Sequence, residues 1–403
     1  MTPGITREEG QLRIRIMKGL VVSPLQFVLL LASIGVLMAL PDIARATENI
    51  PIRERPVFRG MVLGLAAVGL NLLLRHVDLV SFGHAAFFGT GAYTVAILVN
   101  LYGYQSILVV VPIAIVAATL VAALVGYFTL PHEGLYFALV TLAFGQLLYS
   151  IPVGLNQLNN TDGLNVIAPA TGGVGVLERF PTLGGIYFTG RSTPNSILFI
   201  ITIITAIILL LVMFRIARSP FGRALDAIGQ QRTRARFLGL PVKRYVWAAF
   251  IISGFYGGVA GALYAIFFTT GVDPAKTLQV FVSGDILYIA ILGGFNTLTG
   301  PFIGGIVFEV LSDIASNFTL TGPAGETEVG RLVTGVVLLL IVFVFPSGVV
   351  GSLKRGGRVR EAGATLKNDP SVIGPWLSQA ASGAVDAVKR AGQNIRVLLL
   401  GVK

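Results

Sequence analysis

Acidic side chains inside strongly apolar stretches are the first residues whose chemistry needs an explanation. Asp285, Glu309 and Asp313 lie within or at the ends of such stretches, and the last two are one helical turn apart. A charge buried in lipid costs several kcal/mol, so each acid is expected to face a partner, a cavity or the membrane surface. For Asp285 and Glu309 two interpretations stay open, which are structural pairing and a role in a translocation pathway.

A histidine stands in a second unusual segment, where glycines interrupt an apolar run. Gly83 and Gly89 weaken a helix there, while Ser81 and His84 bring polar groups into it. Interrupted helices of this kind line cavities in membrane proteins, because water or substrate can satisfy the loosened backbone groups. We therefore predict these four residues as part of a pathway, with hydrogen-bonded packing as the alternative for His84.

Sequence signatures of enzymatic chemistry are missing. The chain has no P-loop consensus, no nucleophile elbow, and no zincin or kinase signature. It contains no Cys and three His, which excludes disulfides and leaves too few ligands for a histidine metal centre without carboxylates. We expect no enzymatic activity, no cofactor and no bound metal, and any ATP must be hydrolysed by a partner.

The elements that position these residues are membrane-spanning helices. Of the 403 residues 54% are hydrophobic and 12% charged, a composition that indicates lipid as the main solvent. A helix needs roughly 20 apolar residues to cross a bilayer. We therefore predict an all-α integral membrane protein with about ten transmembrane helices. The predicted spans are 20–40, 57–74, 82–103, 106–130, 135–153, 196–214, 245–268, 280–295, 301–316 and 330–350.

Charge sorts between the loops in a way that predicts orientation. With a cytoplasmic N-terminus, Lys and Arg concentrate in the inner loops, which is the positive-inside pattern, and both termini lie in the cytoplasm. The net charge of +11 therefore does not indicate nucleic acid, which would need a basic face on a soluble domain. Spans 2–5 and 7–10 receive opposite orientations, as inverted repeats would.

Three regions follow from this topology. Residues 1–19 form a cytoplasmic N-terminal segment, 20–350 the transmembrane domain, and 351–403 a basic cytoplasmic tail with an amphipathic helix over about 376–400. Two interpretations of the tail stay open: a flexible segment that touches anionic lipid of the bilayer, and a segment that docks a partner.

The densest positive cluster lies in one inner loop, 215–244. Gly and Pro bound a predicted helix over about 223–237, with Leu225, Ile228, Phe237 and Leu238 along one apolar edge and a stop at Gly239. The basic residues either anchor the loop at lipid headgroups or belong to a docking helix for a soluble motor. They are Arg215, Arg218, Arg223, Arg232, Arg234, Arg236, Lys243 and Arg244, against only Asp226.

This loop resembles the coupling segment of LivM-type permeases from branched-chain amino-acid ABC importers. The resemblance rests on the run GRALDAIG at 222–229 and on ARFLG at 235–239, although Gln230 and Gln231 occupy positions where relatives often carry acids. In that family the segment docks on the ATPase subunit. The resemblance therefore implies coupling roles for Gly222, Arg223, Ala224, Asp226, Ala227, Ile228, Ala235 and Gly239.

Further runs carry the same resemblance over residues 57–350 in family order. They are LNLLL at 70–74 with SFGHAAFFGTGAY at 81–93, then ILGG at 291–294 with GPFIG at 300–304, and finally FPSG at 345–348. The stretch 75–80 departs from the family pattern, where small residues and Gly-Gln are usual. Here Arg75 and Asp78, three residues apart, would pair if this stretch were helical.

The resemblance implies a type II ABC importer architecture in a prokaryotic cytoplasmic membrane. The implied partners are a second, LivH-like permease subunit, two cytoplasmic ATPase subunits and an extracytoplasmic binding protein that delivers leucine, isoleucine or valine. Related permeases carry urea, short amides or aromatic acids, so these cargoes stay open. An ion-coupled secondary transporter that uses Asp285 and Glu309, and a non-transporting scaffold, are the alternatives from other classes.

Overall fold

The chain divides into two compact units, Met1–Val350 and Gly351–Lys403. The structure is a computed structural model that describes residues 54–104, 106–158, 160–164, 166, 196–268 and 271–316, seven short strands, and positions 335, 336 and 348. All of these residues belong to the first unit. The predicted tail 351–403, with its amphipathic helix, lies outside the described residues.

Long apolar helices make up most of the described part. They are α2 (Glu54–Val77), α3 (His84–Asn100), α4 (Ile107–Thr129), α5 (Leu135–Gly154), α6 (Ser196–Arg218), α9 (Val242–Phe267), α11 (Val280–Gly293) and α12 (Gly300–Ser316). Six spans among the described residues are long and apolar enough to cross a membrane. One of them is formed by α11 together with the short α10 (Pro274–Thr277) that precedes it. Helices α3 and α12 are not among the six, since each has only 17 residues. These helices correspond to the predicted spans from 57–74 to 301–316. Predicted spans 20–40 and 330–350 lie almost wholly outside the described residues, so the number ten stays a prediction.

Short antiparallel strands lie outside the long helices, most of them in segments predicted not to span. Strands β1 (Gly4–Glu8), β2 (Gln11–Met17) and β3 (Leu20–Val22) form one sheet in that order. Two further pairs are β4 (Thr182–Leu183) with β5 (Ile186–Tyr187), and β6 (Thr319–Gly322) with β7 (Gly325–Glu328). The strands depart from the all-α prediction outside the long helices, and β3 occupies the first residues of the predicted span 20–40.

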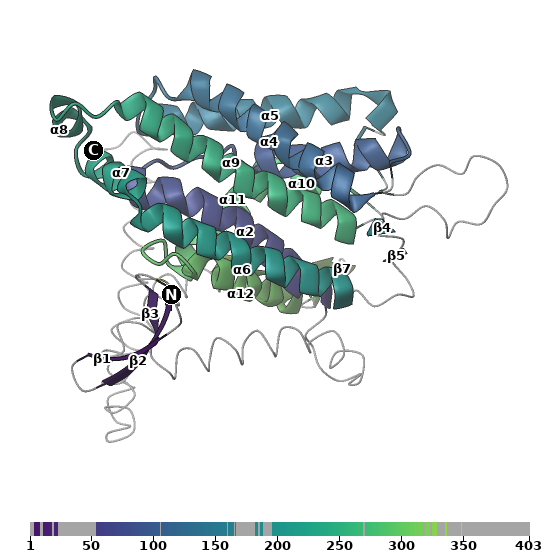
Figure 1. The fold of residues 1–403 in the computed structure, drawn as a ribbon. Helices are drawn as coiled ribbons and strands as arrows, with labels where there is room; N and C mark the ends of the chain where they lie inside the picture. The colour runs from purple at the N-terminus through teal and green to yellow at the C-terminus, as the bar shows by residue number, and fades with distance from the viewer. Residues whose placement is uncertain are drawn as a thin grey trace. The chain divides into compact units, whose positions relative to one another are not determined.

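Helix α2 lies at the centre of the described bundle, between α12 and α9 (Figure 1). It runs antiparallel to α12, because Gly60 faces the backbone of Gly305 and Gly64 faces Phe302. A Cβ at Gly60 would stand 2.6 Å from the carbonyl oxygen of Gly305. Small residues thus let the two backbones meet, as in membrane helix pairs generally.

Helix α3 begins inside the bundle. Its first residue, His84, hydrogen-bonds Ser253 near the middle of the 26-residue α9, and the two helices then run side by side in the same direction. Residues 78–83 connect the end of α2 to this point without helical structure. The predicted interruption of the helix is therefore present, at the N-terminal end of the span.

Candidate functional site

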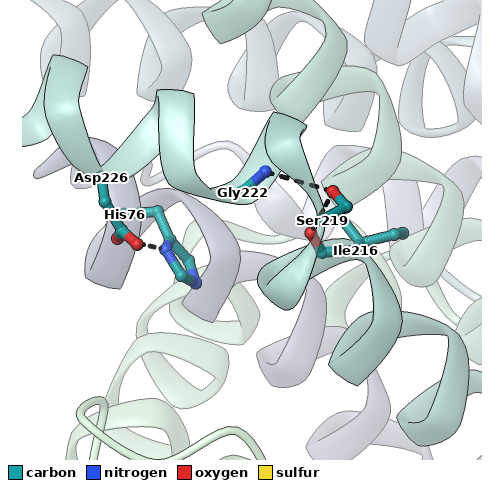
Figure 2. A network of polar contacts seen from close by, with 5 residues as sticks. All are labelled: His76, Ile216, Ser219, Gly222 and Asp226. Atoms are coloured by element: carbon teal, nitrogen blue, oxygen red, sulfur yellow. Dashed lines mark hydrogen bonds and ion pairs between the residues drawn. The ribbon is translucent and has the colours of Figure 1, made fainter. Parts of the chain in front are cut away.

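Local capping signals start the first helix of the predicted coupling segment. Ser219 accepts a hydrogen bond from the backbone N–H of Gly222 at 3.3 Å and donates to the carbonyl of Ile216 at 2.7 Å, and Pro220 occupies the first turn (Figure 2). Ser at the N-cap followed by Pro is a favoured helix start. The chain thus leaves α6 and immediately begins α7 (Pro220–Gln230).

Helix α7 has one face on the bundle and one face free. Leu225 and Ile228 are fully buried, and Phe221 stacks on Tyr245 of α9 with ring centroids 5.5 Å apart. The exposed residues of the other face are Arg223, Ala227 and Gln230. This amphipathic pattern fixes which side chains a soluble partner can reach.

The predicted helix 223–237 is in fact two helices, which corrects the sequence prediction. The break lies at Gln231, whose backbone is extended, and α8 (Arg232–Phe237) follows in a new direction. There Arg232 and Arg236 lie 2.9 and 3.7 Å from the carboxylate of Glu133, in the turn between α4 and α5. The break therefore lets α8 reach a second anchoring point on the bundle.

The predicted single apolar edge is also wrong. Leu225 and Ile228 are buried under α7, whereas Phe237 and Leu238 are 88% and 74% exposed. Gly239 ends α8 as predicted, with a φ of 82° that suits glycine, and the N–H of Leu240 donates to the carbonyl of Ala235 at 3.1 Å. Phe237 and Leu238 thus form an exposed apolar tip at the end of α8, directly after Arg236.

Asp226 points toward the membrane helices. Its Oδ1 lies 2.5 Å from Nδ1 of His76, in the last turn of α2, and the His76 side chain is only 3% exposed (Figure 2). The expected local pair of Arg75 with Asp78 has no helical geometry, because α2 ends at Val77 and Asp78 has a left-handed φ of 55°. The sequence analysis did not identify His76 as the partner of Asp226, although His76 lies within the stretch that departs from the family pattern.

The predicted pathway residues near the start of α3 form a packed polar cluster. His84 is fully buried, its Nε2 lies 2.6 Å from Oγ of Ser253, and its ring meets that of Phe87 edge-on. Ser81 is also fully buried and its hydroxyl accepts from the N–H of Gly83 at 3.3 Å. The contacts match the packing interpretation of His84, and its pathway role stays a prediction.

Side chains from two other helices complete this helix start. Thr141 of α5 accepts from the N–H of Phe82 at 3.2 Å, and Ser283 of α11 accepts from the N–H of Ala85 at 2.8 Å. A Cβ at Gly89, one turn further on, would overlap the side chain of Leu278. The glycine there serves close packing, and side chains of neighbouring helices satisfy the N–H groups of Phe82 and Ala85.

Glu309 has a partner that sequence reasoning did not identify. Its side chain is 6% exposed and its Oε2 lies 3.3 Å from the guanidinium of Arg59 in α2. Asp285 lies on α11, partly buried and within electrostatic range of both groups. The sequence did offer a clue to this pairing, because Arg59 is the one basic residue inside the predicted span 57–74.

Comparison with known families decides the assignment. The family model described as "Branched-chain amino acid transport system / permease component" matches residues 54–342, which include all the long described helices and the coupling segment. The chain belongs to this family. The permease shares 26% identity over 309 residues with the high-affinity branched-chain amino acid transport system permease protein LivM of Escherichia coli strain K12, covering 72% of the permease and 68% of LivM.

Two further relatives extend the comparison. The LivH permease protein of Salmonella typhimurium is 23% identical over 310 residues, covering 73% of the permease and 94% of LivH. The nucleoside ABC transporter permease protein NupC of Lactococcus lactis subsp. cremoris is 28% identical over 206 residues, covering 45% and 62%. No solved structure is significantly similar to the permease.

Exposure separates the predicted coupling residues of the permease into two groups. Arg223, Ala227 and Gly239 are exposed. The others face the bundle wholly or in part, and these are Gly222, Ala224, Asp226, Ile228 and Ala235. The described helices leave the first group uncovered and cover the second wholly or in part, and the coupling role of both groups stays a prediction.

Proposed function

We propose that this chain is one of two permease subunits that together form the membrane pathway of an ATP-driven importer of branched-chain amino acids. The chain spans a prokaryotic cytoplasmic membrane ten times, with 20–40 and 330–350 as first and last spans and both termini in the cytoplasm. Spans 2–5 and 7–10 form inverted repeats, and the second subunit is LivH-like. Family membership and the run of apolar helices support this proposal.

The coupling segment is the observation that carries the proposal. Helices α7 and α8 stand at the bundle end that the positive-inside rule assigns to the cytoplasm. Their inner side is anchored at His76 and at Glu133, while their outer side presents Arg223, Ala227 and the Phe237 tip. A segment that only anchors the protein at lipid headgroups needs arginines alone. A segment that transmits motion from an ATPase needs fixed contacts with the membrane helices and an exposed face for the ATPase.

In the proposed mechanism two soluble ATPase subunits close on ATP and push the coupling segments of the two permeases. The segments carry this motion into the helix bundles, which then switch access from one side of the membrane to the other. Cargo delivered by an extracytoplasmic binding protein crosses between the two permeases. The chain itself performs no chemistry, in line with relatives that are permease subunits.

The proposed pathway residues are those predicted from the sequence, and the structure divides them into two groups. Ser81, Gly83, His84 and Gly89 shape the start of α3 and would affect transport by holding the interrupted helix in place. Asp285 and Glu309 lie in another part of the bundle, with Arg59. We propose that this charged group lies along the outer half of the pathway.

Branched-chain amino acids are the proposed cargo because the LivM and LivH relatives cover most of the chain. Nucleosides are the second candidate, because the nucleoside permease relative matches with similar identity over a shorter region. Calorimetry of the cognate binding protein with leucine, isoleucine, valine, urea, aromatic acids and nucleosides distinguishes these cargoes.

Uptake by the complete complex in proteoliposomes tests the function. We expect leucine uptake only when ATP is inside with the ATPases and binding protein is on the other side. Uptake driven by a proton or sodium gradient without ATP would contradict the proposal and favour a secondary transporter.

A further inference from the structure

The last turn of α2 is fastened to the inner face of α7 by two contacts. Asp226 lies 2.5 Å from His76, and Gly229, on the same face of α7, packs against the backbone carbonyl of His76. A Cβ at position 229 would overlap that carbonyl oxygen. Residues three apart on a helix share a face, so the polar contact and the backbone contact act together.

The His76 imidazole depends on Asp226. Its Nε2 is buried and has no hydrogen-bond partner in the described part of the chain, so Nδ1 makes the polar contact. An ionised carboxylate only accepts hydrogen bonds, and Nδ1–H of His76 therefore donates to it. The ring is buried while the Asp226 side chain is 47% exposed, so the contact ties a fixed group in the bundle to one at its surface.

The chain beyond His76 leads directly into the interrupted helix. After α2 ends at Val77, the N–H of Leu79 donates to the carbonyl of Leu73 at 3.2 Å, and both Leu79 and Ser81 are buried. Three residues after Ser81, α3 starts at His84, beside Ser253 inside the bundle. A displacement of the C-terminal end of α2 therefore displaces residues 78–83, which form a short, packed connection to the start of α3.

We propose that His76 is a positioning residue that makes α7, the end of α2 and residues 78–83 move as one unit. The inference rests on the proposed function, because it supplies the internal route by which a docked ATPase moves the interrupted helix. Asp226 is then an inward contact of the coupling segment. It does not touch the ATPase.

A fluorescent probe at position 80 tests this route. Val80 is 38% exposed and the chain contains no Cys, so Val80→Cys gives a single labelling site in this subunit for an environment-sensitive fluorophore. The complete complex in proteoliposomes should change its emission when ATP binds. Asp226→Ala and His76→Leu should reduce that change by roughly two- to thirty-fold, the range of single contacts in coupled networks.

Two matched variants separate this role from general destabilisation. His76→Asn keeps an N–H donor near the position of Nδ1 and should restore most of the emission change. Asp78→Asn removes an exposed carboxylate at the same end of α2, at a left-handed position that Asn tolerates, and should leave the signal unchanged. ATPase co-purification should be normal in all four variants, and leucine imported per ATP hydrolysed should fall only in Asp226→Ala and His76→Leu.

An unchanged emission response in Asp226→Ala, or an equal loss in Asp78→Asn, would overturn the inference. Loss of ATPase co-purification in Asp226→Ala would also overturn it, since that result would make Asp226 a docking residue. The emission change needs ATP and assembly but no cargo. A complex that imports no amino acid therefore contradicts the proposed function while the probe still tests the route through His76.

Discussion

Arg59 and Glu309 join α2 to α12 by an ion pair inside the membrane region. The Glu309 side chain is nearly buried and the Arg59 side chain is about one third exposed, with N and O atoms 3.3 Å apart. Removal of one partner leaves the other charge poorly solvated, whereas replacement of both by apolar groups of similar size removes the penalty. The pair therefore specifies how two helices meet more than it adds stability.

The first prediction concerns this pair. Glu309→Leu should destabilise the permease by about 1–3 kcal/mol, less than a fully buried pair would lose because Arg59 keeps some solvent. The double variant Arg59→Met with Glu309→Leu should recover most of that loss. Thermal melting of the purified permease measures both effects. A single variant as stable as the parent protein would contradict the pairing.

The second prediction concerns the polar cluster at the start of α3. Ser253→Ala removes the partner of a fully buried imidazole, whose Nδ1 already has none among the described residues, and should cost about 1–3 kcal/mol. ATP-dependent uptake per assembled complex should stay close to normal if His84 serves packing. A large loss of uptake with an unchanged melting temperature would instead favour the pathway role.

Single residues also mark the limit of sequence reasoning. Glu309 was recognised as a charge in need of a partner, because the cost of burial follows from residue type alone. Arg59 and His76 were not assigned as partners, because they lie 250 and 150 residues away along the chain from Glu309 and Asp226. Contacts at such separations depend on helix packing, which one sequence does not specify.

At the scale of elements, α3 and α9 pack through glycines. Gly261 of α9 faces the carbonyl of Phe88, and Gly257 faces the side chain of Phe87. Lipid is as apolar as these helices, so backbone approach replaces the hydrophobic effect as the source of specificity.

The third prediction follows from this packing. Gly261→Ala should overlap the Phe88 carbonyl and destabilise the permease by about 1–3 kcal/mol, despite the better helix propensity of Ala. Gly154→Ala at the end of α5 is the matched control, since an added Cβ there meets nothing within 4 Å. Melting temperatures should differ between the two variants. Equal effects would show that the α3–α9 contact is looser than the structure indicates.

The fourth prediction concerns the free face of α7. Arg223→Ala should weaken binding of the ATPase subunits by roughly tenfold, equivalent to about 1.4 kcal/mol, because Arg223 lies on the exposed face of α7, away from the buried Leu225 and Ile228. The melting temperature of the isolated permease should not change. Co-purification at graded ATPase concentrations measures the affinity. If the affinity for the ATPase subunits does not change, Arg223 is not part of the docking surface.

Elements were predictable to the extent that local signals define them. Apolar length located the long helices, and Pro220 and Gly239 bounded the helix predicted over 223–237, although α7 already begins at Pro220. The break at Gln231 was not predictable, because it accompanies contacts of Arg232 and Arg236 with Glu133, about 100 residues away. The inward orientation of Asp226 on α7 was not predictable either, because its partner His76 lies 150 residues away along the chain.

For the whole molecule, charge and hydropathy predict one orientation, and the described contacts are consistent with it. The coupling segment, the turn at Glu133 and the end of α2 meet at one end of the bundle, which the charge pattern assigns to the cytoplasm. The chain after α3, where Tyr102 is 69% exposed, lies at the opposite end. An account in which a soluble ATPase drives transport requires these two ends to face different compartments.

Site-specific crosslinking tests that requirement most directly. Single cysteines at Phe237 and at Tyr102, both well exposed, are introduced in turn into this chain, which has none of its own. In the assembled complex we predict that the Phe237→Cys protein crosslinks to an ATPase subunit and that the Tyr102→Cys protein does not. Labelling of the cysteine at 237 from the cell exterior, or an ATPase crosslink from 102, would contradict the account.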